Sequence, residues 1–268
     1  MPAKSDAPTL SNSRATSRKL ATLAAVLVIC VCLAIAAVAL ATQTLQVNAH
    51  FSPDKLGAPT NLSLTAKFVS STAGPPSPVT KFILYAPAGM EIDTRGAGTC
   101  TAATLEQRGP SGCPTSSRAG FGGGIGVLQL PTETIHAQYT LDLFFAPKES
   151  GRLRLLVYVS VVKPAGVELV LVAKQIPASK PYGLGFSVEV PPVSTFPGAA
   201  DASVESAFVT LGGSNVAYFK TVHGKRKLVS LRGIIVPKTC PAGGFPTEGT
   251  VDFADGSTLT VHPTIPCP

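Results

Sequence analysis

The sequence predicts an all-β protein, an antiparallel β-sandwich ectodomain preceded by one transmembrane or signal helix. Beyond residue 41, short apolar or alternating runs are separated by turn residues, and the whole chain has 25 Gly and 24 Pro. No long stretch of this part has a capped 3.6-residue period. About twelve short strands without intervening helices favour two packed antiparallel layers. The helix is predicted by a long uncharged run near the amino terminus.

The uncharged run covers residues 20–41. As a helix that rises about 1.5 Å per residue, it spans roughly 33 Å, enough to cross a hydrocarbon core of about 30 Å. Residues 1–19 are rich in Ser, Ala and Thr and are expected to form a disordered tail. Their basic side chains outnumber the single acid, Asp6, and positive flanks stay in the cytoplasm. The sequence therefore predicts a cytoplasmic tail, a membrane segment and an exported domain at 42–268.

The membrane segment has two possible fates. It is longer than the apolar core of a signal peptide, which favours an uncleaved signal anchor. However, Ala39-Leu40-Ala41 also fits a signal-peptidase site before Thr42. The expected location is the cell membrane, as a single-pass protein with an extracellular carboxy-terminal domain. If cleavage follows Ala41, the protein is secreted.

The expected strands follow one another along the exported part. Residues 60–68 and 135–143 alternate apolar and polar side chains, which is typical of a strand with one buried face. Denser Leu and Val runs at 152–162 and 167–173 indicate strands covered on both faces. Further strands are expected at 79–85, 184–190, 203–211, 216–222, 228–236, 251–253 and 258–261.

Turn residues separate these strands. Pro164-Ala165-Gly166 divides the two dense runs, and Asp255-Gly256 is typical of a hairpin turn. Residues 223–227 are expected to form the basic tip of another hairpin. The proline-rich segment 190–198 is the candidate boundary between two subdomains.

The six cysteines fall into two groups by location. Cys30 and Cys32 lie in the apolar run, and four more lie in the exported part. An even number in an oxidising compartment favours disulfides, and four cysteines allow three pairings. A zinc site would need close C-x-x-C pairs, which this part lacks. The most local pairing is preferred, and it joins Cys100 to Cys113 and Cys240 to Cys267.

The charge of the exported part is mild, at +4 for residues 42–268. Lys225, Arg226 and Lys227 form a basic cluster and are the candidate contact residues, together with the loops around Cys100 and Cys113. Fitting partners are the membrane, an anionic envelope polymer or a surface protein. Nucleic acid is excluded as a partner because no basic stripe is interleaved with aromatic residues.

No motif predicts a catalytic residue, a cofactor site or a metal site. The glycine run at 120–126 lacks both the G-x-G-x-x-G spacing and a following helix. It is expected to be a flexible loop or a strand edge with close backbone approach. No G-x-S-x-G or H-E-x-x-H motif occurs, so surface positions are expected for the histidines, which are His50, His136, His223 and His262. The absence of Trp disfavours a sugar-stacking platform.

Several short motifs occur together in the exported part. They are Ala58-Pro59-Thr60-Asn61-Leu62, Cys113-Pro114, Cys240-Pro241-Ala242-Gly243-Gly244-Phe245, Asp255-Gly256-Ser257 and Cys267-Pro268. In these, residues 58–268 resemble uncharacterised exported proteins of actinobacterial type, which pair an amino-terminal membrane or signal segment with a β-rich ectodomain. The resemblance implies an exported β-domain and brings no activity or catalytic residue.

The sequence favours a non-catalytic role. We expect a single-pass cell-envelope protein whose β-sandwich serves surface interaction or structural support, with no cofactor. One alternative is a secreted hydrolase whose site is assembled from distant residues. Another is a sandwich that binds a lipid or a sugar.

Overall fold

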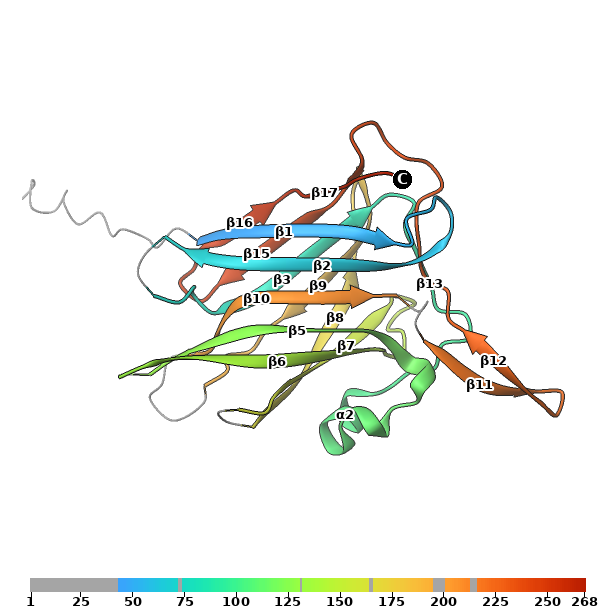
Figure 1. The fold of residues 1–268 in the computed structure, drawn as a ribbon, viewed down its shortest axis with the longest axis horizontal. Helices are drawn as coiled ribbons and strands as arrows, with labels where there is room; N and C mark the ends of the chain where they lie inside the picture. Colours follow the sequence, from blue (N-terminus) through green and yellow to red (C-terminus); the bar gives the residue numbers. More distant parts are fainter. Residues whose placement is uncertain (1–42, 72–73, 131, 164–165, 195–200, 213–215) are drawn as a thin grey trace, which may run out of the picture. The chain divides into compact units, whose positions relative to one another are not determined.

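A computed structural model describes residues 43–71, 74–130, 132–163, 166–194, 201–212 and 216–268 (Figure 1). The predicted tail at 1–19 and membrane segment at 20–41, with Cys30 and Cys32, lie outside these residues. Among the residues that are described, no helix is both long and apolar enough to cross a membrane.

The described residues are mostly antiparallel β-sheet, which confirms the all-β prediction. Short helical segments occur at α2 (Ala102–Arg108), η1 (Pro110–Gly112) and η2 (Thr115–Ser117). The strands are β1 (Gln43–Ser52), β2 (Pro59–Ser70), β3 (Val79–Pro87), β4 (Glu91–Asp93), β5 (Arg118–Gln129), β6 (Thr134–Phe145), β7 (Arg154–Val161), β8 (Val167–Ile176), β9 (Tyr182–Glu189), β10 (Ser203–Leu211), β11 (Ala217–Val222), β12 (Lys225–Ser230), β13 (Gly233–Ile235), β14 (Phe245–Pro246), β15 (Glu248–Phe253), β16 (Thr258–Val261) and β17 (Thr264–Ile265).

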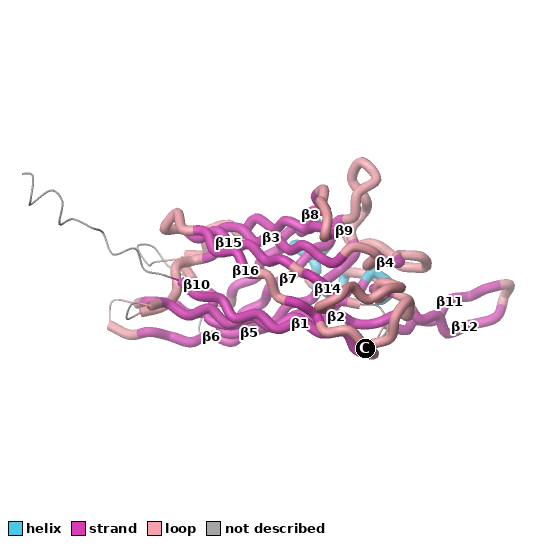
Figure 2. The backbone as a smooth tube through the Cα atoms, turned by 90° about the horizontal axis from the view of Figure 1, so that it is seen from above, coloured by secondary structure: helices cyan, strands magenta, loops and turns pink. Residues whose placement is uncertain are grey.

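Thirteen of the described strands form one sheet in the order β16-β15-β3-β9-β8-β7-β6-β5-β10-β2-β13-β4, with β1 also paired to β2. The sheet curls over, so that β1, β2, β10, β5 and β6 face β15, β3, β9 and β8 (Figures 1 and 2). At the join, β1 lies close to β16. Two further strand pairs, β11–β12 and β14–β17, lie outside this sheet.

The strand order differs from the chain order at several places: β9 pairs with β3, and β13 lies between β2 and β4. β10 lies between β2 and β5, and β15 pairs with β3. The late strands therefore complete a sheet that the early strands leave open.

The glycine run lies in β5, in the middle of the sheet, and is therefore neither a flexible loop nor a strand edge. The close backbone approach that it was expected to allow does occur. A Cβ atom on Gly122 would overlap the carbonyl oxygen of Phe208, and one on Gly124 would overlap that of Ser206. The Tyr139 hydroxyl passes over Gly124 and donates to the Ser206 carbonyl at 2.9 Å. Glycine thus lets β10 approach β5 closely where the sheet curls.

Helix α2 covers the outer face of the sheet at β6–β8. Thr101 caps its amino end, because its side-chain oxygen accepts from the Thr104 N–H at 3.1 Å. Leu105 is fully buried and packs in a cluster that includes Phe144 and Leu156. The helix therefore buries the outward apolar side chains of strands that the sequence predicted to be covered on both faces.

Strand assignments also differ from the sequence-based expectations, whereas the candidate subdomain boundary stays a prediction. The expected strand at 228–236 is divided between β12 and β13, with Gly233 at a φ of 60°, which only glycine adopts readily. β1 was not expected and runs the length of β2. The candidate boundary at 190–198 lies partly outside the described residues, and residues 42–268 group as one compact unit.

Candidate functional site

The candidate contact residues Lys225, Arg226 and Lys227 are the first residues of β12, and their side chains are exposed. The turn of the hairpin consists of His223 and Gly224, with φ of 48° and 73°. Positive φ at both positions is typical of a two-residue type I′ turn. The basic cluster therefore belongs to a strand beside the turn, and not to the turn itself as the sequence suggested.

The four cysteines among residues 43–268 form the two local pairs that the sequence favoured. The Cα atoms of Cys100 and Cys113 are 5.4 Å apart, and those of Cys240 and Cys267 are 6.0 Å apart, distances typical of disulfides. The first bond closes the segment that contains α2, and the second ties the loop after β13 to the residues after β17. Both bonds have the position of structural staples.

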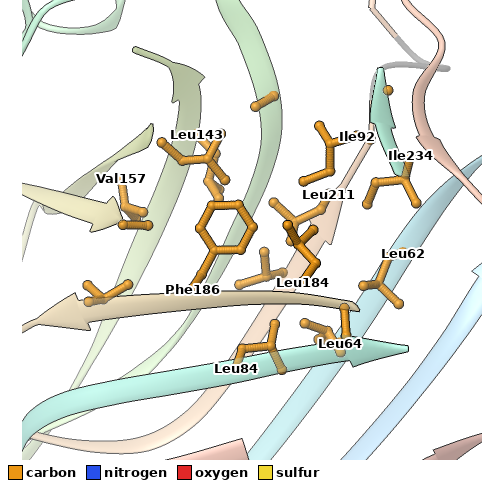
Figure 3. A pocket seen from close by; sticks show the side chains of 18 of the residues that line it. Leu62, Leu64, Leu84, Ile92, Leu143, Val157, Leu184, Phe186, Leu211 and Ile234 are labelled. Carbon is orange, nitrogen blue, oxygen red and sulfur yellow. The ribbon is translucent and has the colours of Figure 1, made fainter. Parts of the chain in front are cut away.

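A cavity of about 170 Å³ lies inside the curled sheet, and it is partly open. Figure 3 shows side chains from both halves of the sheet converging on it. Leu62 and Leu211 come from one half, and Leu84, Leu184 and Phe186 from the other. Ten strands in all contribute to the lining, so the cavity is a property of the whole sheet rather than of one loop.

The lining is apolar throughout: every residue on it is aliphatic, Phe, Met, Ala or Gly. The strand alternation explains this, because Leu141, Leu143 and Phe145 of β6 all point inward while the residues between them point out. Small residues, among them Ala119 and Ala173, face the same interior. Since protein cores are usually filled to crystal-like density, a space of this size is unusual.

The chemistry of the cavity is limited to apolar burial. Of the residues that the structure describes, none on the lining could act as an acid, a base, a nucleophile or a metal ligand. A polar ligand group would lose its hydrogen bonds to water on entry without replacing them, which costs free energy. An apolar cavity of about 150 Å³ is known to take a benzene ring. The arrangement therefore fits a short piece of hydrocarbon.

The four histidines are all exposed, as the sequence predicted. Two of them face a carboxylate: His136 Nδ1 lies 2.7 Å from Glu205, and His262 Nδ1 lies 3.4 Å from Glu248. A hydrolytic site also needs a nucleophile within hydrogen-bond reach of such a pair. Among the described residues, no hydroxyl or thiol is hydrogen-bonded to either ring, and no group of His, Cys, Asp and Glu could hold a metal ion.

A cluster of one carboxylate and two arginines lies near the base of the β11–β12 hairpin. The Asp93 carboxylate accepts from the Arg95 side chain at 2.9 and 2.6 Å and lies 3.6 Å from Arg232. The hydrogen bonds from Arg95, with the charges of both arginines, hold the pKa of Asp93 at about 2. This cluster joins the end of β4 to the residue before β13, so its role is structural.

Comparison of the chain with protein-family models, with curated protein sequences and with solved structures gives no match. The fold and the cavity are therefore the basis for a functional conclusion.

Sequence reasoning missed the cavity because alternation shows which side chains point inward and not whether they fill the space. One signal was present. Gly120, Gly122 and Gly124 share the inward face of β5 with Ala119 nearby, opposite large residues of β6 and β10. A strand whose inward-facing residues are this small predicts one of two arrangements. Either the two halves of the sheet pack closely together, or a cavity remains between them.

Proposed function

We propose that this chain is a non-catalytic, single-pass protein of the cell envelope whose curled sheet, as a β-sandwich ectodomain, binds the hydrocarbon part of a lipid. The observation that carries the proposal is the apolar cavity between the two halves of the sheet. Burial of hydrocarbon there lowers the free energy by roughly 25 cal/mol for each Å² of apolar surface removed from water. Sugar fits less well, since no side chain on the lining offers a hydrogen bond to a hydroxyl group.

Two features support a location at the membrane with the domain outside. The uncharged run at 20–41 follows a basic tail, as in a signal anchor. Four cysteines of the exported part form two local pairs, and disulfides persist in oxidising compartments. A lipid-binding domain at this location would meet its ligand in the adjoining bilayer.

The size of the cavity limits the ligand. A space of this volume holds about as much as a benzene ring, so it takes only a segment of a long chain. Because the cavity is partly open, the rest of the chain and a polar headgroup would remain outside it. The proposed ligand class is therefore an amphiphile with a linear alkyl chain, such as a fatty acid.

Photocrosslinking tests this proposal on the full-length chain. A fatty acid with a diazirine near its methyl end should label cavity-lining residues such as Phe186 and Leu143, identified by peptide mass spectrometry. A173F places a large ring in the cavity and should abolish that labelling. Q138F, on the exposed outer side of β6, adds the same ring elsewhere and should leave the labelling unchanged.

Labelling confined to residues 20–41 would mean that the probe detects only the lipid around the membrane segment, and the proposal would then be wrong. Equal labelling of the interior in wild type and A173F would also contradict it. Circular dichroism of A173F shows whether its sheet is intact.

A further inference from the structure

The β11–β12 hairpin extends away from the curled sheet (Figures 1 and 2). Its base is anchored, because the Tyr218 hydroxyl donates to the Gly96 carbonyl and Leu231, at the end of the hairpin, is buried in a cluster with Phe145 of the sheet. Beyond this base, most of its side chains are exposed on both faces of the two-stranded ribbon. Such a ribbon is marginally stable by itself, and here it projects where a partner can reach it.

The charge of the hairpin is of one sign. Residues 217–230 include Lys220, Lys225, Arg226 and Lys227 and no Asp or Glu. Within the part of the chain that the structure describes, none of these four cations forms an ion pair. The hairpin therefore carries four positive charges that no acidic residue of the hairpin balances. This equals the net charge of +4 of the whole segment 42–268.

The hairpin also exposes apolar side chains, which share one face of the ribbon with Arg226, while the three lysines lie on the other face. Phe219 is 58% exposed and Leu228 is 61% exposed, and they are opposite each other in the strand register. The Arg226 guanidinium lies 4.1 Å from the centre of the Phe219 ring, a cation–π contact that leaves the ring accessible. An apolar face opposite a Lys-rich face is typical of amphipathic segments that lie in the headgroup layer of a bilayer.

We infer that the β11–β12 hairpin docks on the surface of an anionic lipid bilayer. Lys220, Lys225 and Lys227 would bind lipid phosphates, while Phe219 and Leu228 enter the region below the headgroups. A ribbon within the headgroup layer has phosphates on both of its faces, so cations on either face contribute. A soluble anionic polymer would use the charges and leave the two apolar side chains in water. The inference does not depend on the cavity, and either proposal can fail alone.

The test uses the full-length chain held in neutral phosphatidylcholine nanodiscs and mixed with separate vesicles, with and without phosphatidylglycerol. Because the chain has no Trp, F219W provides a single fluorophore at the hairpin. Its emission should shift to the blue with the anionic vesicles and be quenched by brominated acyl chains. F121W, at a residue 48% exposed on β5, is the matched control and should respond to neither.

Neutralising the hairpin tests the charges. Each cation near an anionic surface contributes about 1 kcal/mol, or roughly fivefold in affinity, so K220Q/K225Q/R226Q/K227Q should weaken vesicle binding at least a hundredfold. K55Q/K148Q/K174Q/K180Q removes the same charge from other exposed positions and should have a much smaller effect. Binding should also fall as salt is raised.

Two outcomes would overturn the inference. If both quadruple variants weaken binding equally, the contact reflects net charge and not the hairpin. If soluble polyphosphate binds as tightly as the vesicles, and the F219W emission never shifts, the partner is an anionic polymer and not a bilayer.

Discussion

At the scale of single residues, Asp93 joins parts of the chain that are far apart in sequence. Its side chain is 8% exposed, and it receives hydrogen bonds from Arg95 and the charge of Arg232. Arg232 lies between β12 and β13, so this carboxylate holds the base of the hairpin against β4. No motif in the sequence revealed the cluster, because its members meet only after β13 pairs with β4.

We predict that D93N destabilises the protein in a pH-dependent manner. The pKa of Asp93 is lowered from 3.8 to about 2 in the folded state, so its contribution is fully present above the unfolded value and is lost as the pH falls toward 2. Because Arg95 is largely exposed, we expect only about 1 kcal/mol at neutral pH. Urea unfolding of wild type and D93N across this range measures it. A difference that persists at the lowest pH, or an equal loss in the exposed control D54N, would contradict the prediction.

At the scale of elements, periodicity located the strands whose side chains alternate and missed those without a readable pattern. The segment at 135–143 lies in β6, where Ala137, Leu143 and other residues predicted to share a face do so. β5 was missed because glycine has no side chain to alternate. The division between β12 and β13 was missed because the residues on both sides of it have the composition of a strand. The break itself depends on a positive φ at Gly233.

The glycines of β5 provide a second prediction. G122A should lower the free energy of unfolding by about 2 kcal/mol or more, because its Cβ would overlap a backbone oxygen of β10 that cannot rotate away. G166A is the matched control, since a Cβ atom there meets nothing within 4 Å, and it should change stability little. Denaturant unfolding of both variants decides the matter, and equal stabilities would show that β10 can shift without cost.

The Cys100–Cys113 disulfide, which closes the segment that contains α2, provides a third prediction. The C100A/C113A substitution should lower the free energy of unfolding by about 3 kcal/mol, the entropic value for closing a loop of this length. In a C240A/C267A background, which lacks the second disulfide, reductant should lower the free energy of unfolding by the same amount. Thermal unfolding with and without reductant measures this. A wild type insensitive to reductant would contradict the prediction.

At the scale of the whole molecule, a continuous sheet encloses a space that the described residues do not fill. The sequence could predict an all-β domain, because turn residues and alternation are local signals. The cavity could not be predicted, because it depends on how many strands form the curved sheet. In the function that we propose, this space takes up hydrocarbon, and binding of the ligand should then stabilise the fold.

A fatty acid should therefore raise the unfolding free energy of the full-length chain, by about 2.7 kcal/mol at a concentration of 100 times its Kd. The gain should be absent in A173F and retained in Q138F. Chemical unfolding with and without the ligand measures it, and a stabilisation that A173F shares would place the binding site elsewhere.

The position of β10 between β2 and β5 also has a consequence for biogenesis. A ribosome or a translocation pore delivers the chain from its amino end, so β2 and β5 emerge with bare edges well before residues 203–211 can reach them. Unpaired edges of this kind invite pairing with other chains. Until its last quarter arrives, the nascent polypeptide should depend on holding chaperones, and stalled fragments that end before residue 203 should aggregate.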